Sequence, residues 1–141
     1  MIWLSADRVL VHRKPLNASF GGGALELPGG KLEVGEGPAA ALGRELREEW
    51  GAGASRLRVG PVAEVLHHVY PPPGPEVILV VYHVDGALLP AGPVEAMGLS
   101  LEPGLSLLAC DVAELPVSEF LAADRDWVAA VRDGRVRAPA F

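Results

Sequence analysis

The feature that most constrains the fold is 28-PGGKLEVGEGPAAALGRELREEWGA-52, in which a glycine-rich turn runs into an amphipathic helix. Pro38 suits the first helical position and Gly51 suits the left-handed residue just past the end, so we expect a helix from about Pro38 to Trp50. At about 100° per residue, one side of this helix is apolar and is expected to face a core. That side carries Ala39, Leu42, Leu46 and Trp50.

Three carboxylates occupy a neighbouring face of the same helix. Glu45 lies three and four residues before Glu48 and Glu49, so all three fall within about 100° of one another. Like charges at these spacings repel by a few tenths of a kcal/mol each, and the helix dipole disfavours anions near the C-terminus. Two local rules of helix design are therefore broken in one turn, which often marks a functional site.

Two explanations of this acidic cluster stay open at this point. The first is a solvated face that is salt-bridged by Arg44 and Arg47, since Arg44 and Glu48 are i,i+4. The second is a divalent cation, because the turn at residues 28–30 can aim a backbone carbonyl at the helix and Mg²⁺ prefers oxygen ligands. Zinc is disfavoured, since no histidine lies at helical spacing with these acids. The candidate ligands are Gly30, Glu45, Glu48 and Glu49.

The rest of the chain predicts an α/β fold with a mixed sheet. Expected strands cover residues 2–5, 8–13, 24–27, 61–70, 76–84 and 105–110, with a loop at 85–104 and a last helix from about Ala122 to Asp133. The strand at 76–84 is apolar on both faces, which places it inside a covered sheet. Phe120, Trp127 and Val131 recur at helical spacing and indicate a core stripe. We expect one domain, residues 1–141, with helices on both faces of the sheet.

Composition excludes several classes of partner. The net charge of −6 and the lack of a basic run argue against binding to polymeric nucleic acid, although a small nucleotide can bind through a metal. No segment approaches the roughly 18 apolar residues of a membrane span, and the N-terminus lacks the pattern of a signal peptide. The cytoplasm is the expected location. Cys110 is the one cysteine, which excludes an internal disulfide, and it reads as a small buried hydrophobe.

The acidic helix and its turn resemble a known family motif. Gly30, Glu36 and 44-RELREEWGA-52 match the Nudix box, G-x5-E-x7-R-E-U-x-E-E-x-G-U, where U is a bulky apolar residue. All the fixed letters stand at the required spacing, and the one departure is Ala52, which is smaller than the usual last residue. The segments 28-PG-29 and 113-AELP-116 also look like the family. By this resemblance the chain is identified as a member of the Nudix (MutT-like) hydrolases, which implies an α/β/α sandwich.

The resemblance also implies a reaction, the Mg²⁺- or Mn²⁺-dependent hydrolysis of a diphosphate bond in a nucleoside diphosphate linked to a group X. A bound metal neutralises the diphosphate and lowers the pKa of its water, and a carboxylate takes the proton. By position, Glu48 and Glu49 would bind metal with the Gly30 carbonyl, and Glu45 would be either a ligand or the base. Arg44 would orient Glu45. Glu36 would brace the loop, and Gly51 would close the helix.

Two further groups of residues follow from the resemblance. Members of the family often take a base or ligand from a later loop, where this chain has Glu95 and Glu102 as candidates; the alternative for each is a solvent-facing acid. Substrate specificity in this fold comes from loops outside the box. The substrate-binding candidates, each with a surface role as the alternative, are Lys31, Arg13, His68 and Tyr70.

By the resemblance, the short chain looks more like the family members that cleave nucleoside triphosphates, which implies a nucleoside or deoxynucleoside triphosphate, or a related small nucleotide, with release of a nucleoside monophosphate. ADP-ribose and dinucleoside polyphosphates are the alternatives; Tyr70 lies one residue from the position typical of the second group, and Pro61 and Pro71 flank the position typical of the first. A sensor that binds nucleotides without turnover is another alternative, but the intact set of acids favours an enzyme. A mixed sheet would offer an edge for a homodimer, although no sequence feature fixes the oligomeric state.

Overall fold

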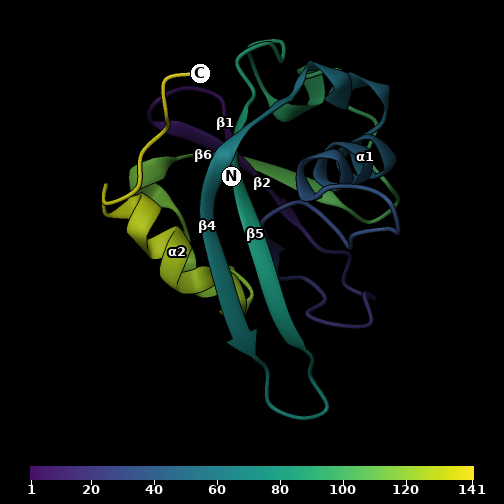
Figure 1. The fold of residues 1–141 in the computed structure, drawn as a ribbon. Helices are drawn as coiled ribbons and strands as arrows, with labels where there is room; N and C mark the ends of the chain where they lie inside the picture. Colours follow the sequence, from purple (N-terminus) through teal and green to yellow (C-terminus); the bar gives the residue numbers. More distant parts are fainter.

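The computed structural model describes residues 1–141 and places a mixed sheet between two helices (Figure 1). The strand order is β3-β2-β1-β5-β4, and β6 also pairs with β2. The sheet is mixed because β1 runs antiparallel to β2 and parallel to β5. The strands are β1 (Ile2–Trp3), β2 (Arg8–Arg13), β3 (Leu25–Glu26), β4 (Arg58–Val69), β5 (Glu76–Asp85) and β6 (Ser106–Asp111).

The helix that carries the acids has the predicted limits. Helix α1 (Pro38–Trp50) begins with Pro38 in its first turn, and Gly51 follows it with φ 74°, where its N–H donates to the carbonyl of Arg47 at 3.0 Å. Helix α2 (Ala122–Arg132) matches the last predicted helix. Four short 3₁₀ turns were not predicted: η1 (Ala52–Arg56), η2 (Val94–Ala96), η3 (Val112–Glu114) and η4 (Val117–Glu119).

Each face of the sheet has its own core, which confirms the expected α/β/α arrangement. On the α1 side, Leu46 and Trp50 pack against Ile2, Leu10 and Val84 of the strands. Full burial of such side chains contributes about 1.5–3 kcal/mol each. On the α2 side, the first member of the predicted core stripe precedes the helix and forms an isolated bridge with Leu25, but all three members are buried against β1, β2 and β5. These are Phe120, Trp127 and Val131.

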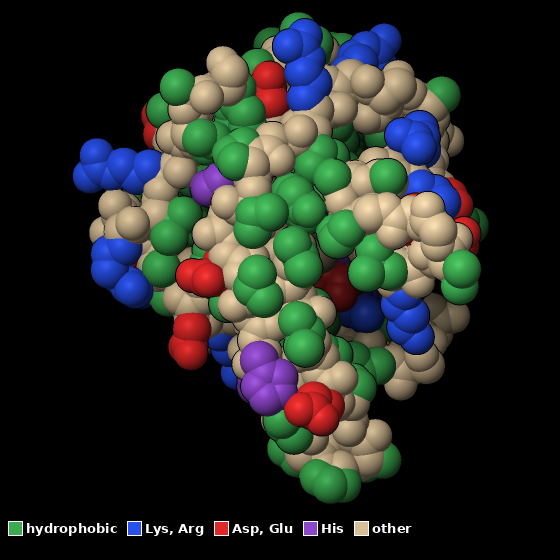
Figure 2. All heavy atoms as spheres, viewed as in Figure 1, with side chains coloured by type: hydrophobic (Ala, Val, Ile, Leu, Met, Phe, Trp, Pro, Cys, Tyr) green, Lys and Arg blue, Asp and Glu red, His purple; other side chains and the backbone are tan.

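Two expectations about burial are wrong in part. Ala39 is exposed, because a helical wheel gives the direction of the core but not how far the next layer extends along the helix. Strand β5 is interior and buried at Val81 and Val84, but Ile78 is 72% exposed. The reason is that the β4–β5 hairpin extends beyond both helices (Figure 1), and hydrophobic side chains gather over it in the space-filling view (Figure 2).

The remaining expectations concern one strand, one side chain and the membrane. Strand β4 begins at Arg58, earlier than predicted, and lies at the end of the strand order. Cys110 is half-buried against the α2-side core, and burial raises the pKa of its thiol. Neither helix combines the length and the apolarity that crossing a bilayer requires.

Candidate active site

The guanidinium group of Arg44 joins helix α1 to the loop before it. Its Nη2 donates to Glu36 Oε1 at 2.7 Å and to the carbonyl of Lys31 at 2.9 Å, and its Nε donates to Glu36 Oε2 at 3.2 Å. These charge-assisted bonds lower the pKa of Glu36. The loop at residues 31–36 is thereby tied to the helix by Arg44.

The remaining nitrogen of Arg44 faces two of the three clustered acids. Nη1 donates to Glu45 Oε1 at 3.1 Å and to Glu48 Oε2 at 3.2 Å. The structure thus contains the i,i+4 ion pair of the salt-bridge explanation, and it also shows how the repulsion between Glu45 and Glu48 is offset. Both side chains reach solvent, at 18% exposure for Glu45 and 55% for Glu48.

The glycine-rich turn approaches Glu45 more closely than any other residue type would allow. Gly29 has φ 154°, outside the range that side-chain-bearing residues favour, and it makes the turn. A Cβ built on Gly30 would overlap the carboxylate of Glu45. The peptide of Gly30 therefore lies directly against the Glu45 carboxylate. This is the arrangement expected if a backbone carbonyl and an acidic side chain bind the same cation.

Glu49 turns away from Arg44 and toward the sheet. Its Oε2 is buried without a hydrogen-bond donor, 3.7 Å from the equally unpartnered Nδ1 of His12. Burial, with smaller contributions from the carboxylates of Glu26, Glu45 and Glu102, raises the pKa of Glu49 to about 7. A buried carboxylate oxygen without a partner is costly unless a cation or a proton compensates it.

No three His, Cys, Asp or Glu side chains converge into a ready-made metal site in this structure. The donors that are present nevertheless fit a divalent cation. They are all oxygen atoms, as Mg²⁺ requires, and Gly30 lies so close to the Glu45 carboxylate that a Cβ there would overlap it. In this structure Arg44 binds Glu45 and Glu48 while Glu49 faces His12, and the residues that would hold a metal are these three acids and Gly30.

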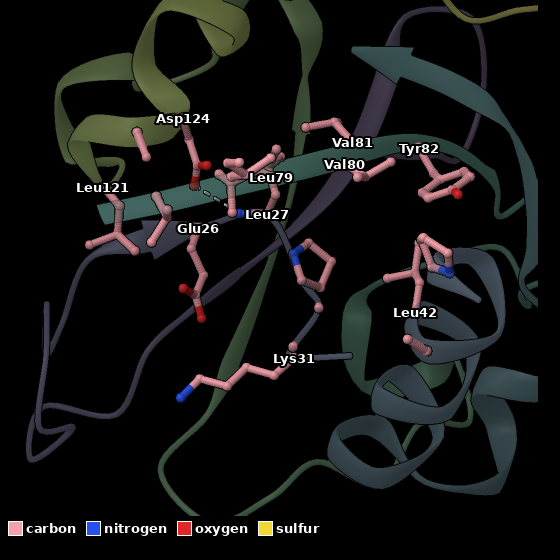
Figure 3. Close-up of a pocket in the computed structure, with 18 of the residues that line it drawn as sticks. Glu26, Leu27, Lys31, Leu42, Leu79, Val80, Val81, Tyr82, Leu121 and Asp124 are labelled. Carbon is pink, nitrogen blue, oxygen red and sulfur yellow. Dashed lines mark hydrogen bonds between the residues drawn. The ribbon is translucent and has the colours of Figure 1, made fainter. Parts of the chain in front are cut away.

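A cleft of about 610 Å³ adjoins this turn and lies between β5, α1 and the start of α2. Its walls are mostly apolar, and the size is typical of small-molecule sites. Gly30 lines the cleft and also contacts Glu45, so the acidic cluster and the cleft share one wall. Figure 3 shows Glu26, Lys31 and Asp124 projecting toward the cleft from β3, the turn and α2.

Asp124 is the most buried acid of the cleft, and sequence reasoning missed it. Its Oδ2 accepts a hydrogen bond from the N–H of Leu27 at 3.2 Å, and the residue is 4% exposed. Burial raises the pKa of Asp124 to about 6. The signal was present in the sequence, because Asp124 interrupts the apolar stripe between Phe120 and Trp127 at helical spacing.

The structure brings two of the four substrate-binding candidates into the cleft. Lys31 and Tyr70 line it, and the Tyr70 hydroxyl accepts a hydrogen bond from the N–H of Ala123 at 3.1 Å. His68 contacts the Tyr70 ring with centroids 4.4 Å apart but does not line the cleft. Arg13 is held elsewhere, because its guanidinium donates to the carbonyl of Gly23 and to Glu119.

The two loop acids differ in position. The backbone N–H of Glu102 donates to the carbonyl of Glu49 at 2.8 Å, so Glu102 lies beside the end of α1. Glu95 lies in η2, where it lines a separate small hollow with Val94 and Leu99.

Comparison with known proteins adds a family and a shared fold. The family model described as the NUDIX domain matches residues 1–129. No curated protein sequence matches significantly. The fold is similar to the solution structure of the E. coli ORF135 protein, with 22% identity, a TM-score of 0.64, and coverage of 96% of this chain and 86% of that chain.

Two further solved structures are similar at the same level. The Nudix hydrolase RenU from M. smegmatis has 22% identity and a TM-score of 0.62, over 92% of this chain and 76% of that chain. The MutT protein from Methanosarcina mazei Go1 has 21% identity and a TM-score of 0.66, over 89% of this chain and 83% of that chain. At such identities the structures demonstrate a common fold.

Proposed function

Because this chain belongs to the NUDIX family, whose members hydrolyse nucleoside diphosphates linked to another group, we propose that it is a Mg²⁺-dependent pyrophosphohydrolase of small nucleotides. The favoured substrate is a nucleoside or deoxynucleoside triphosphate, and the product is a nucleoside monophosphate. We propose that residues 1–141 act as one domain. The observation that carries the proposal is that Gly30 touches the Glu45 carboxylate and also lines the nucleotide-sized cleft.

In this proposal the metal is held by the Gly30 carbonyl, Glu48 and Glu49. The metal supplies charge neutralisation for the diphosphate and a more acidic water. Glu45 either completes the ligand set or takes the proton from the attacking water, which its contact with Gly30 supports. Arg44 positions Glu45 through the bond at 3.1 Å. Glu102 is the better placed of the two loop acids, because it neighbours Glu49.

The cleft supports a nucleoside as the part that is recognised. Its apolar walls suit a base, and Lys31 offers a positive charge close to the turn. A carboxyl group with a pKa of about 6, such as that of Asp124, is able to accept or donate a hydrogen bond near neutral pH. We therefore propose that Asp124 contacts the base edge and that Lys31 contacts phosphate.

A panel of nucleotides incubated with the protein and Mg²⁺ tests the proposal. The panel contains the triphosphates, ADP-ribose and a dinucleoside polyphosphate, and products are separated by anion exchange. We expect a monophosphate from the triphosphates, with Glu48→Gln inactive. Glu33→Gln is the matched control, because Glu33 is an exposed acid that also neighbours Arg44, at 3.8 Å. Tight binding of several members without any monophosphate would instead identify a sensor.

A further inference from the structure

A buried row of polar side chains lies behind Glu49, and the proposed reaction does not use it. His12 of β2 is 1% exposed, and its two ring nitrogens face two different carboxylates. Nε2 lies 2.7 Å from Glu26 Oε1, while Nδ1 lies 3.7 Å from Glu49 Oε2. The other oxygen of Glu26 is 3.4 Å from the Lys14 ammonium group, and both of these residues line the cleft.

The orientation of the His12 ring is fixed by its surroundings. Alternation along β2 puts His12 on the same face as Leu10, which packs toward α1, and the Trp50 ring lies 6.2 Å away. A carboxylate only accepts hydrogen bonds, so Nε2 carries the hydrogen that faces Glu26. With this bond in place, Nδ1 has one direction left, and that direction is toward Glu49.

The two oxygens of the Glu49 carboxylate have different surroundings, because only one of them faces His12. Oε2 is buried and has no hydrogen-bond donor, and Nδ1 of His12 is also buried and has no other partner. Oε1 receives no hydrogen bond either, but it is not fully buried, so solvent reaches it. One oxygen of Glu49 therefore faces the imidazole, and the other is accessible to solvent.

We propose that His12 is a positioning residue for the metal ligand Glu49. The ring closes off the inner side of Oε2 at 3.7 Å, a distance too long for a hydrogen bond, which leaves Oε1 to face the cation, and Glu26 fixes the ring in turn. Groups that orient a metal ligand in this way typically change metal affinity by about 10–100-fold when they are replaced. The inference rests on the proposed function, since it assumes that Glu49 binds the metal.

Two substitutions of His12 test the roles of its two ring nitrogens separately. Asn has its amide at the distance of Nδ1 from the backbone, and Gln has its amide at the distance of Nε2. His12→Asn thus keeps a group facing Glu49, and His12→Gln keeps a group facing Glu26. We expect Mn²⁺ affinity, measured by electron paramagnetic resonance without substrate, to fall about tenfold or more in His12→Gln and clearly less in His12→Asn.

Melting temperatures of both variants in metal-free buffer show whether a loss of affinity is only a loss of fold. If His12 is merely a packing residue, Mn²⁺ affinity will follow the melting temperature in both variants and the expected order will be absent. That result would overturn the inference.

A measurement on the unsubstituted protein covers the case in which a variant does not fold. Mg²⁺ is titrated in while the ring nitrogens of the histidines are followed by NMR. His83 is the matched control, because it is also buried and its Nδ1 accepts a hydrogen bond from Trp3 Nε1 at 2.9 Å. We expect the His12 signals to move with metal and those of His83 to stay. Saturation with Mg²⁺ without any change at His12 would contradict the inference.

Mn²⁺ binding by the natural protein and by two variants distinguishes a wrong role for His12 from a wrong metal site. If the natural protein does not bind Mn²⁺, or if Glu48→Gln binds it equally well, the metal site itself is wrong and the inference falls with it. If Mn²⁺ binds and depends on Glu48, but His12→Gln binds it as the natural protein does, only the role of His12 is refuted.

Discussion

Gly30→Ala is the substitution that tests the contact between the turn and Glu45 most directly. The added Cβ would overlap the Glu45 carboxylate, so either the turn or the Glu45 side chain must move. Because the overlapped atoms end a flexible side chain, the cost is that of a changed rotamer, about 0.5–1.5 kcal/mol, and each kcal/mol lowers the melting temperature of a chain of this length by about 3 °C. A shift of Glu45 also breaks its 3.1 Å bond to Arg44.

The effect on activity should exceed the effect on stability. Misplacement of a catalytic group by about 1 Å can reduce turnover by about 100-fold. Gly37→Ala is the matched control, because Gly37 lies in the same loop with φ −85° and a Cβ there meets nothing within 4 Å. The assay follows triphosphate hydrolysis in Mg²⁺ for both variants, with Mn²⁺ affinity and melting temperature measured in parallel.

We expect Gly30→Ala to lose at least about 100-fold in turnover and Gly37→Ala to remain within a few-fold of the natural protein. Equal activity of the two alanine variants would refute the reasoning, because the contact between Gly30 and Glu45 would then have no part in the reaction.

The other predictions concern one ligand, the metal and one buried acid. Glu48→Gln should lower turnover by orders of magnitude but change stability in metal-free buffer by less than about 0.5 kcal/mol, since Glu48 is 55% exposed. EDTA should abolish hydrolysis, and excess Mg²⁺ should restore it. The pKa of Asp124 is raised from 3.8 to about 6, so the folded protein binds this proton more tightly than the unfolded chain. Urea unfolding should therefore show the natural protein losing about 2 kcal/mol relative to Asp124→Asn between pH 4 and pH 7.

The sequence was most informative where local signals agreed with one another. Pro38 and Gly51 delimit α1 at both ends, and Trp127 and Val131 identify the buried side of α2. These predictions depend on residues within a few turns of each other. The exposed half of β5 was not predictable in this way, because its coverage depends on how far two distant helices extend along the sheet.

The candidate site shows the same limit. Spacing alone grouped Glu45, Glu48 and Glu49 on one face of the helix. It did not predict that Arg44 binds the first two while Glu49 turns toward His12. That division depends on β2, which is distant in sequence and contributes His12. Alternation along 8-RVLVHR-13 did place His12 on the same face as Leu10, and this was the available signal.

In the proposed reaction, the acids of α1 would hold the metal and direct a water molecule at the diphosphate. Hydrolysis of a nucleoside triphosphate in ¹⁸O-labelled water, followed by mass spectrometry of the products, tests it most directly. We predict one ¹⁸O atom in either the monophosphate or the pyrophosphate, only when Mg²⁺ is present and only with Glu48 intact. Products without label, or equal labelling by Glu48→Gln, would contradict the account.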